Sequence, residues 1–375
     1  MRNEWKTESF ENCIEKVIYP RKIQRKDFLA SGAHPVVSQE EEFINGYWDN
    51  EADLFHVTAP VVVFGDHTKV LKYVDFDFAL GADGVKILRP RQFLLPKFFF
   101  YQLQAASLNS LGYARHYKLL RELEIAYPPL PEQQRIVGIL DEAFEGIATA
   151  KANAERNLQN VGALFESHLQ SVFAERGKGW TESTIGEVAE VFDGPHATPK
   201  TVDAGPVFLG ISALQDGRIN LGETRHVTPE DFRRWTRRIK PHTDDVVFSY
   251  ETRLGQAAII PSGLECCLGR RMGLVLPNRK RLDPRFFVYQ YISPPFRAFL
   301  DSRTVRGATV DRIALKEFPS FPIRLPKLHE QERMAAQFES LREETERLGG
   351  LYERKLTALE ALKRSLLHEA FTGKL

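Results

Sequence analysis

Residues Pro131-Glu-Gln-Gln-Arg-Ile-Val137 open a segment, residues 131–177, that occurs a second time at residues 329–375. A shift of 198 positions, from 131 to 329, lays the first copy on the second without a gap. The copies share residues at charged as well as apolar places, including Glu132 and Glu330, Gln133 and Gln331, Arg135 and Arg333, Glu155 and Glu353, and Phe173 and Phe371. Because a common helical pattern does not require identity at charged places, we interpret the two segments as an internal repeat.

Both copies are predicted to be long helices, because their apolar residues recur at steps of three and four. The stripe of the first copy consists of Ile136, Leu140, Ala143, Ile147, Ala150, Ala154, Leu158, Val161, Phe165, Leu169 and Val172. In the second copy the polar residues Thr345 and Lys363 interrupt the matching stripe. A helix of about 45 residues is roughly 65 Å long. A narrow apolar stripe of that length needs a cover, and we expect each copy to cover the other.

Glycines are the one feature that opposes this interpretation. Gly146, Gly162 and the pair Gly349-Gly350 lie inside the predicted helices. Since each glycine disfavours a helix by up to about 1 kcal/mol, we expect neither helix to be ideal and unbroken.

Length and composition indicate a multidomain protein of the cytoplasm. A chain of 375 residues is too long for one ordinary core and suits two or three domains. The sequence has no run of about 18 apolar residues, and its charged start, Met1-Arg-Asn-Glu-Trp5, does not resemble a signal peptide. Cys13 and the adjacent pair Cys266-Cys267 cannot form a disulfide framework or a four-ligand zinc site, so we expect a reducing compartment, no metal and no cofactor.

The segments before the two helices are also related, although gaps are needed. Three pairs of stretches carry the relation: Val61-Val-Val-Phe64 with Asp245-Val-Val-Phe248, Gly84-Val-Lys-Ile-Leu88 with Met272-Gly-Leu-Val-Leu276, and Pro96-Lys-Phe-Phe-Phe-Tyr-Gln-Leu103 with Pro284-Arg-Phe-Phe-Val-Tyr-Gln-Tyr291. The first two pairs are predicted to be strands and the third to begin a helix. The chain is therefore built as domain, helix, domain, helix, and each domain is an α/β globule.

Four stretches, combined with this duplicated order, resemble a specificity subunit of a Type I restriction-modification enzyme over essentially the whole chain. They are Gly112-Tyr-Ala-Arg-His-Tyr117, Leu130-Pro-Glu-Gln-Gln-Arg-Ile-Val137, Asp193-Gly-Pro-His-Ala-Thr-Pro199 and Arg306-Gly-Ala-Thr309. The resemblance implies an α/β fold in which two similar target-recognition domains are separated by two long helices that pair as an antiparallel coiled coil. It implies target-recognition domains at residues 1–130 and 178–327, and spacer helices at residues 131–177 and 328–375.

The resemblance also implies a function. Each domain is expected to read one half of a bipartite site on double-stranded DNA, and the site is expected to be asymmetric because the two domains have diverged. The subunit itself is expected to have no catalytic activity. Its expected partners are modification subunits, two per chain, which methylate adenine with S-adenosylmethionine, and restriction subunits, which add ATP-driven translocation and cleavage.

Other active sites find less support in the sequence. Ser293-Pro-Pro-Phe296 resembles the tetrapeptide with which amino-methyltransferases hold a flipped base, but the glycine-rich Phe-x-Gly-x-Gly turn that holds S-adenosylmethionine is missing. The sequence also lacks a Gly-x-x-x-x-Gly-Lys-(Ser/Thr) phosphate loop and a histidine pair at i, i+4 for zinc. Two alternatives stay open beside DNA specificity: an autonomous DNA adenine methyltransferase, and a coiled-coil scaffold that binds other proteins.

The basic residues cluster in the two domains, while the long helices carry many acids. DNA binding needs arginine and lysine for phosphates and for base edges, and the net charge of +1 means that such residues must be gathered locally or complemented by a partner. The candidates in the first domain are Lys22, Arg25, Lys69 and Arg115, with Lys72 in the same cluster. The candidates in the second domain are Arg234, Arg237, Arg270, Arg271 and Arg306.

Two loops of the second domain add polar candidates. The segment Asp193–Lys200 contains two prolines and a glycine and is predicted to be a rigid turn that presents His196, Thr198 and Lys200 to base edges, or that merely connects strands. Tyr250 and Arg253 follow a strand that is predicted to be buried, a position where loop-borne contacts are often found.

Overall fold

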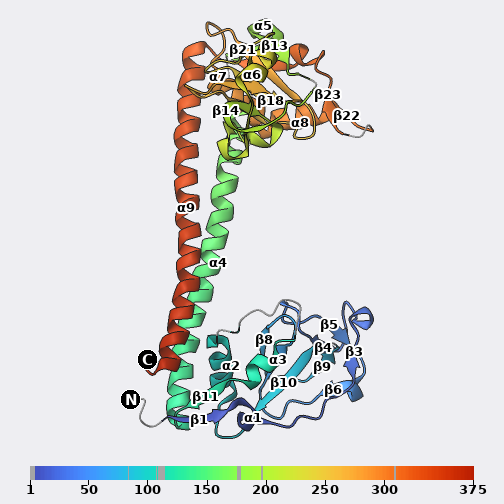
Figure 1. Cartoon of the computed structure of the whole chain (residues 1–375), viewed down its shortest axis with the longest axis vertical. Helices are drawn as coiled ribbons and strands as arrows, with labels where there is room; N and C mark the ends of the chain where they lie inside the picture. Colours follow the sequence, from blue (N-terminus) through green and yellow to red (C-terminus); the bar gives the residue numbers. More distant parts are fainter. Residues whose placement is uncertain are drawn as a thin grey trace. The chain divides into compact units, whose positions relative to one another are not determined.

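The computed structural model describes residues 5–82, 84–106, 108, 115–174, 179–195, 197–307 and 310–375. The chain forms two compact units: the first contains Met1–Glu155 and Glu353–Leu375, and the second contains Arg156–Tyr352. Two helices, α4 (Leu130–Ala174) and α9 (Leu328–Thr372), each contribute one part to each unit (Figure 1). Within the described ranges, no helix combines the length and the apolar character needed to cross a membrane.

The first unit contains two small sheets and a terminal strand pair. One sheet has the order β2-β10-β7-β8 and is antiparallel throughout, with strands Ile14–Glu15, Val85–Pro90, Val61–Gly65 and Leu71–Val74. The other has the order β3-β9-β4-β5, with β6 paired to β9, and its strands are Lys22–Ile23, Phe78–Gly81, His34–Val37, Gly46–Trp48 and, for β6, Leu54–Phe55. The terminal pair is β1 (Lys6–Ser9) with β11 (Glu124–Tyr127).

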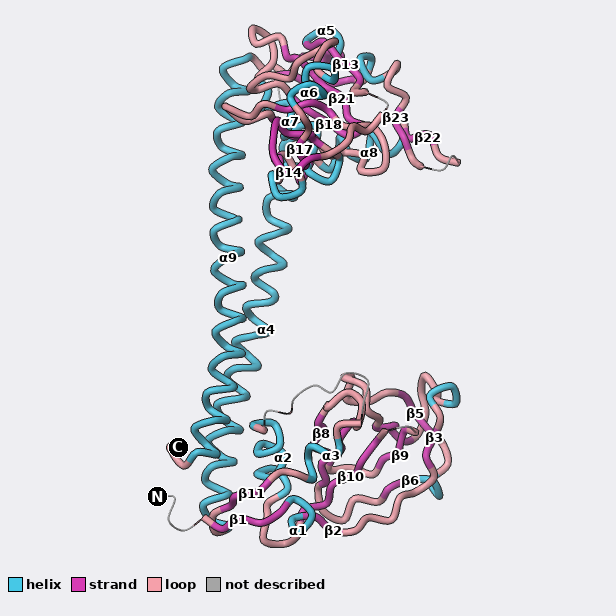
Figure 2. Tube along the Cα trace, in the orientation of Figure 1, coloured by secondary structure: helices cyan, strands magenta, loops and turns pink. Residues whose placement is uncertain are grey.

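Short helices connect these strands. They are α1 (Phe10–Cys13), α2 (Pro96–Ala105) and α3 (Tyr117–Arg121), with 3-10 turns η2 (Arg25–Asp27) and η3 (Glu51–Asp53). Figure 2 shows α2 between the strands of this unit and the long helices. Phe98 and Phe99 of α2, the helix predicted to begin at Pro96, are buried in the core.

The second unit repeats this plan. Its terminal pair is β12 (Thr181–Thr184) with β24 (Pro322–Leu325), and its antiparallel sheet has the order β13-β21-β18-β19, with strands Ala189–Asp193, Met272–Pro277, Val246–Ser249 and Ala257–Ile259. A further sheet has the order β17-β14-β20, with strands Arg225–His226, Val202–Leu209 and Cys266–Leu268. Two hairpins complete the strands: β15 (Leu214–Gln215) with β16 (Arg218–Ile219), and β22 (Thr304–Val305) with β23 (Arg312–Ile313).

Two of the helices of the second unit follow each other directly at Ser293. The helices of this unit are α5 (Ile185–Val188), α6 (Pro229–Trp235), α7 (Pro284–Ile292) and α8 (Pro294–Ser302), with 3-10 turns η4 (Ile211–Ala213), η5 (Leu221–Glu223) and η6 (Phe318–Ser320). The helix predicted to begin at Pro284 is confirmed as α7, which ends at Ile292. The structure has two helices that meet at Ser293, because the residue before a proline is disfavoured in helical geometry.

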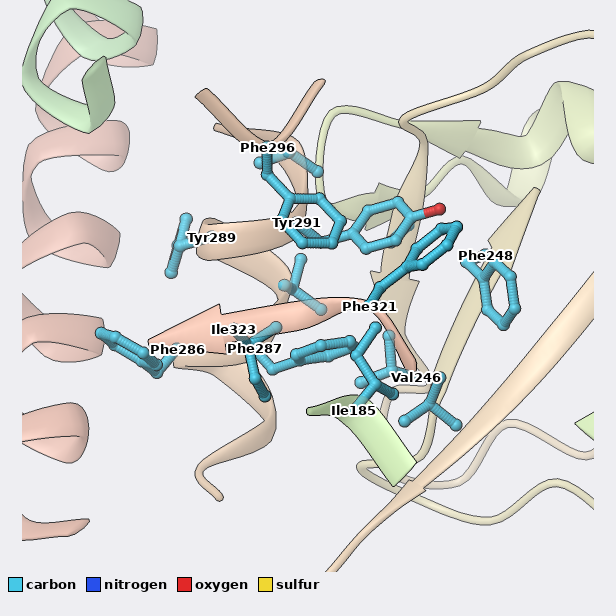
Figure 3. Close-up of a cluster of buried hydrophobic side chains, with 14 of the residues drawn as sticks. Ile185, Val246, Phe248, Phe286, Phe287, Tyr289, Tyr291, Phe296, Phe321 and Ile323 are labelled. Carbon is cyan, nitrogen blue, oxygen red and sulfur yellow. The ribbon is translucent and has the colours of Figure 1, made fainter. Parts of the chain in front are cut away.

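The core of the second unit is aromatic (Figure 3). The rings of Phe248 on β18 and Phe318 on η6 stack with their centroids 4.2 Å apart, and Tyr291 on α7 lies beside both. Burial of each such side chain contributes on the order of 2 kcal/mol. The strands predicted at Val61–Phe64 and Asp245–Phe248 are confirmed as β7 and β18, which are buried on both faces.

The start of each long helix is fixed by the same buried glutamine. In the first unit Gln133, which is fully buried, accepts a hydrogen bond from Leu95 N (2.8 Å) and donates to Phe93 O (2.9 Å) and Pro128 O (2.8 Å). In the second unit Gln331 accepts from Asp283 N (2.9 Å) and donates to Arg281 O (3.0 Å) and Pro326 O (2.9 Å). We call each of these arrangements a glutamine clamp, and it explains why both copies of the repeat have a glutamine at this place.

Two further contacts are repeated between the short helix and the long helix. The hydroxyl of Tyr101 donates to Asp141 in the first unit, and that of Tyr289 donates to Glu339 in the second. Burial raises the pKa of both tyrosines, and the carboxylate that accepts the hydrogen bond raises it further. The phenols therefore stay protonated and hold α2 against α4 and α7 against α9.

The long helices are antiparallel within each unit. Residues with higher numbers on α4 contact residues with lower numbers on α9. In the first unit Lys151 pairs with Glu360 (2.6 Å between Nζ and Oε1), and the ring of Phe144 lies 5.2 Å from Nζ of Lys363. In the second unit His168 lies against Phe338, and Gly349 lies near Leu158. The expectation that each copy covers the other is thus confirmed.

The expectation of interrupted helices was wrong. Both α4 and α9 run without a break through Gly146, Gly162 and Gly349. A Cβ built at Gly146 or Gly162 meets nothing within 4 Å, so these glycines serve no close approach. In a long helix that is packed against another, cooperativity and tertiary contacts outweigh the local preference of single glycines.

We predict that Gly146→Ala and Gly162→Ala each raise the free energy of unfolding by up to about 1 kcal/mol, because alanine fits the open surface and is the better helix former. Thermal denaturation of the full chain measures the effect. Gly217→Ala is the contrasting control, since φ is +96° there and a side chain is strained. A loss of stability in the two helix variants would show that the glycines have a role in packing.

We predict that Gln133→Ala lowers the free energy of unfolding by about 3 kcal/mol, because three main-chain groups, one buried and two partly buried, lose their partners. Urea denaturation of the full chain tests this, with Gln134→Ala as the matched control. Gln134 is the exposed neighbour on the same helical turn, so its substitution should change stability by about 0.5 kcal/mol or less. Equal effects of the two substitutions would contradict the clamp.

Candidate nucleic-acid interface

One edge of the second unit gathers loops from distant parts of the sequence. Strands β14 and β20 are parallel and end together at Leu209 and Leu268. Because the carboxyl ends of parallel strands lie at the same edge, the loops that follow at Gly210 and Gly269 are neighbours. The contact is close: Gly269 N donates to Leu209 O at 2.7 Å, and a Cβ at Gly269 would lie 2.3 Å from that oxygen.

This edge contains a pocket of about 330 Å³ with a basic lining. Its lining includes Thr198 from the loop before β14, Ser212 from η4, Arg225 from β17, and Arg270 and Arg271 from the loop after β20. The structure thus brings together Thr198, Arg270 and Arg271, which the sequence analysis named separately. We call residues 197–200, 210–212, 251–253 and 269–271 the reading edge.

Two arginines of the reading edge are engaged by the protein. Nε of Arg271 lies 2.9 Å from Oε2 of Glu251, and Nη1 of Arg253 donates to Ser212 O at 3.0 Å. Arg271 and Thr252 have φ of 73° and 67°, a left-handed conformation that is costly for residues other than glycine. Such a conformation persists only where the surroundings impose it, which is common in functional loops.

A second group of arginines lies on and after α6. Thr228 caps this helix by accepting from Asp231 N at 3.1 Å, Pro229 opens it, and Phe232 is buried beneath it. The pocket beside it, about 460 Å³, is lined by Arg234, Trp235, Arg237, Arg238 and Asp193, among others. Arg238 forms an ion pair with Asp193, so it is engaged inside the protein.

Five other basic side chains of this unit are not held by any acid that the structure describes. Within the ranges that the structure describes, Arg225, Arg234, Arg237, Arg270 and Lys200 form no ion pair with another side chain. Arg306 is exposed but pairs with Asp301. His196 lies outside the described residues. Arg225 was missed by the sequence analysis, since it is a single cation on a two-residue strand and has no local pattern.

Tyr250 does not lie on this surface. Its side chain is only 6% exposed and belongs to the aromatic core, where burial raises the pKa of the phenol. Its main chain is also engaged, because Tyr250 N donates to Arg271 O and Tyr250 O accepts from Ile313 N. Burial therefore argues against the predicted DNA contact through this side chain, and its role is to hold the loop that carries Thr252 and Arg253.

The first unit has an equivalent edge with a different charge. Parallel strands β3, β9 and β4 end at Ile23, Gly81 and Val37. Lys22 lies here with its Nζ 5.1 Å from the ring of Tyr19, and Arg25 lies 3.9 Å from Glu40. Three consecutive acids, Glu40-Glu41-Glu42, follow β4. The two units therefore present different chemistry at corresponding edges.

The other basic candidates of the first unit divide into exposed and buried residues. Arg115 is exposed, and Lys69 has a left-handed φ of 63° and donates to Leu108 O at 3.4 Å. Lys72, placed in the same cluster, is only 4% exposed, and it donates to Phe43 O, Glu42 O and Oδ1 of Asn45. Burial lowers the pKa of Lys72 to about 8. Its ammonium holds the acidic loop in place and is not available to phosphate.

The methyltransferase-like tetrapeptide is also structural. Ser293 is fully buried, and its hydroxyl donates to Gln290 O at 2.6 Å between α7 and α8. Phe296 packs against Tyr291 in the core. The Ser293 hydroxyl and the Phe296 ring are thus both engaged by the protein itself, which argues against a role in holding a base. Among the described residues, no group of three or more His, Cys, Asp or Glu side chains is arranged to bind a metal ion.

Comparison with known proteins agrees with the duplication. The chain is 24% identical over 343 residues to the Type I restriction enzyme EcoR124I/EcoR124II specificity subunit of Escherichia coli, which covers 86% of this chain and 83% of that protein. It is 25% identical over 272 residues to the putative type I restriction enzyme MjaX specificity subunit of Methanocaldococcus jannaschii, with 68% and 60% covered.

Solved structures show the same fold. A chain from the study "Structural basis underlying complex assembly and conformational transition of the type I R-M system" matches with a TM-score of 0.74 and 20% identity, covering 100% of this chain and 99% of that chain. The HsdS subunit from Thermoanaerobacter tengcongensis matches with a TM-score of 0.59 and 20% identity, covering 100% and 98%.

A family model described as Type I restriction modification DNA specificity domain matches residues 5–157 and 177–353, one stretch in each half of the repeat. The two matched stretches make up most of the chain, and each contains one glutamine clamp and one edge of parallel strands. The chain therefore belongs to the family of Type I restriction-modification DNA specificity domains, and it contains two of them.

Proposed function

We propose that this chain reads a bipartite, asymmetric site on double-stranded DNA, with residues 1–130 and residues 178–327 as its two recognition domains. The observation that carries the proposal is the contrast between a duplicated framework and unlike edges. The glutamine clamps match bond for bond. The edges do not match: in the first domain three consecutive acids follow β4, whereas in the second domain arginines line the pocket at the edge. Two copies of one scaffold with different reading surfaces are what an asymmetric target requires.

In the second domain, the free arginines support contact with the DNA backbone and with base edges. Arg270 and Arg225 share a pocket, and Arg234 and Arg237 line another. A guanidinium without an internal partner can donate its fork to phosphate or to the O6 and N7 atoms of guanine. Arg253 and Arg271 are instead satisfied by protein groups, so we assign them to loop positioning.

In the first domain, acids at the edge favour a different way of reading. Carboxylates repel phosphate but accept hydrogen bonds from the N4 amino group of cytosine in the major groove. Lys22, Arg25, Lys69 and Arg115 supply the cations around them. Arg25 lies close enough to Glu40 to be held near the edge.

Chemistry on the DNA would come from partners rather than from this chain. We propose that it is non-catalytic and docks modification subunits, two per chain, as well as restriction subunits, in the cytoplasm. Exposed apolar side chains on the long helices, Leu164, Leu351 and Leu362, lie among charged residues and suit a protein surface. The modification subunits would supply S-adenosylmethionine chemistry, and this chain would contribute orientation and sequence choice.

We predict that Arg270→Ala and Arg234→Ala weaken DNA binding of the complex reconstituted with its modification subunits. A base contact should cost about 1 to 3 kcal/mol and relax one position of the site, while a phosphate contact should lower the salt slope by about one. Titration at several salt concentrations distinguishes the two. Arg364→Ala, an exposed residue on α9, is the control and should change neither quantity. Unchanged affinity and slope in both domain variants would assign these arginines to ordinary surface.

We predict that replacing residues 1–130 by the matching segment of a relative changes one half of the methylated site and leaves the other half intact. The clamp of the first unit depends on main-chain partners, so the exchanged domain should still seat on α4. Methylome sequencing of cells that contain the complex measures both halves together. Replacement of residues 178–327 is the reciprocal control and should change the opposite half. A change in both halves from either exchange would refute independent reading.

A further inference from the structure

A hairpin of the second domain is seated against the long helices. Strands β15 and β16 are joined by Asp216-Gly217, whose φ values of 44° and 96° match the turn that favours tight hairpins. A Cβ at Gly217 would lie 2.8 Å from Nη1 of Arg342 on α9 and 3.2 Å from Cδ1 of Ile292 on α7. The turn is therefore pressed into a place that only glycine fits.

Arg218, the residue after the turn, binds α9 at two points. Its Nη2 lies 2.8 Å from Oε1 of Glu339, and its Nη1 lies 2.7 Å from Oε2 of Glu346. These two acids lie two helical turns apart on one face of α9. Arg342, between them, also pairs with Glu346 at 3.1 Å. One guanidinium thus spans two turns of the helix.

Arg297 on α8 connects the same hairpin to the other long helix. Its Nη2 lies 2.8 Å from Oδ1 of Asp216, and its Nη1 lies 3.4 Å from Oε1 of Glu166 on α4. Gln256 also donates to Asp216, at 2.9 Å. Burial alone would raise the pKa of Asp216, but the hydrogen bond from Gln256 and the charge of Arg297 outweigh it and lower the pKa. We call Asp216, Arg218 and Arg297, with these partners, the brace.

The brace is directly connected to the reading edge. Strand β14 ends at Leu209, and the chain passes through η4 into β15. Ala213 and Leu214 at this passage are fully buried, so the connection is rigid. Arg253 of the reading edge donates to the main chain of η4 at Ser212. A rotation of the hairpin on the helices would therefore move the edge as well.

The first unit differs in this respect. Within its described residues, the ion pair that joins the domain to a long helix is Lys97 with Asp141, 2.8 Å between Nζ and Oδ2, and it comes from α2. That contact belongs to the repeated framework, next to the Tyr101 hydrogen bond. The brace belongs to the second domain: its arginines, Arg218 and Arg297, take no part in the repeated contacts, although one of its acids, Glu339, also accepts the repeated hydrogen bond from Tyr289.

We propose that Arg218, Arg297 and Asp216 are positioning residues that fix the orientation of the second reading edge on the helix pair, and that they determine how strictly the complex measures the gap between the two half-sites. This proposal rests on the proposed function. The ion pairs are partly exposed to solvent, and pairs of that kind contribute little to folding. Their effect is on the orientation of the second domain relative to the part of the helix pair that it contacts, because they connect one small hairpin to two helices.

The test uses the full chain reconstituted with its modification subunits and the duplex site identified by methylome sequencing. Methylation rates are measured on the natural gap and on gaps one and two base pairs shorter or longer. The variant is Arg218→Met with Arg297→Met. Lys240→Met is the matched control, because it removes an exposed ion pair, with Glu265, that touches neither long helix.

In the double variant we expect the preference for the natural gap over a gap changed by one base pair to fall about tenfold, the size expected when a coupled contact is lost. Discrimination against a base change within either half-site should stay as in the unaltered complex, as should all properties of the control. Arg218→Lys keeps the positive charge but has one terminal nitrogen, so it cannot bind Glu339 and Glu346 as the two nitrogens of the guanidinium do. It should therefore retain only part of the gap preference. If the double variant does not assemble, the gap preference of Arg218→Lys is compared with that of the unaltered complex and of Lys240→Met.

An unchanged gap preference in the double variant, or a loss of base discrimination equal to the loss of gap discrimination, overturns the proposal. Loss of methylation at every gap length by a folded double variant also overturns it, because a positioning role predicts activity on other gaps. Failure of the proposed function would look different: the unaltered complex itself would then methylate DNA without sequence preference.

Discussion

A side-chain amide that is buried without contact to water must have all its hydrogen bonds satisfied, or it destabilises the protein that contains it. Gln133 and Gln331 meet this condition by joining three chain segments each: the turn before the short helix, the proline turn before the long helix, and the long helix itself. The direction in which α4 and α9 leave their domains is set there. The tyrosine–carboxylate contacts of Tyr101 and Tyr289 then hold the next turns in line.

The glutamine clamps and the brace differ in kind. The clamps are buried and symmetric between units, and their loss is a loss of folding energy. The brace is polar, partly exposed and present in the second domain, where Arg218 and Arg297 reach both long helices. The core of the two domains is duplicated, but their surfaces are not. Each domain can therefore keep the common fold and still have its own contacts with the long helices and its own loops at the edge of the parallel strands.

Much of this architecture could be predicted from the sequence, because identity at a fixed spacing and apolar periodicity are local signals. They gave the repeat, both long helices and the central strands. Contacts between distant residues leave no such signal. Lys72 was expected at the surface as a cation of a basic cluster, and Tyr250 as a residue that follows a strand, but both side chains are buried, on β8 and directly after β18. The glycines of α4 were given too much weight, since tertiary packing of a long helix decides its continuity. Arg225, Asp216 and Arg218 lie in two-residue strands and turns, whose partners only the folded chain reveals.

All six partners of the two clamp amides are main-chain groups: Leu95 N, Phe93 O, Pro128 O, Asp283 N, Arg281 O and Pro326 O. Main-chain groups are nearly the same whatever side chain they carry, so the clamp demands little of the residues it holds beyond an N–H at positions 95 and 283, which excludes proline there. A domain with other side chains can thus be held by the same glutamine, provided that it presents these main-chain groups and a partner for Asp141, which Tyr101 and Lys97 contact in the first unit. The physical chemistry of one amide thereby leaves the surfaces of the two domains free to differ, while both units use the same glutamine.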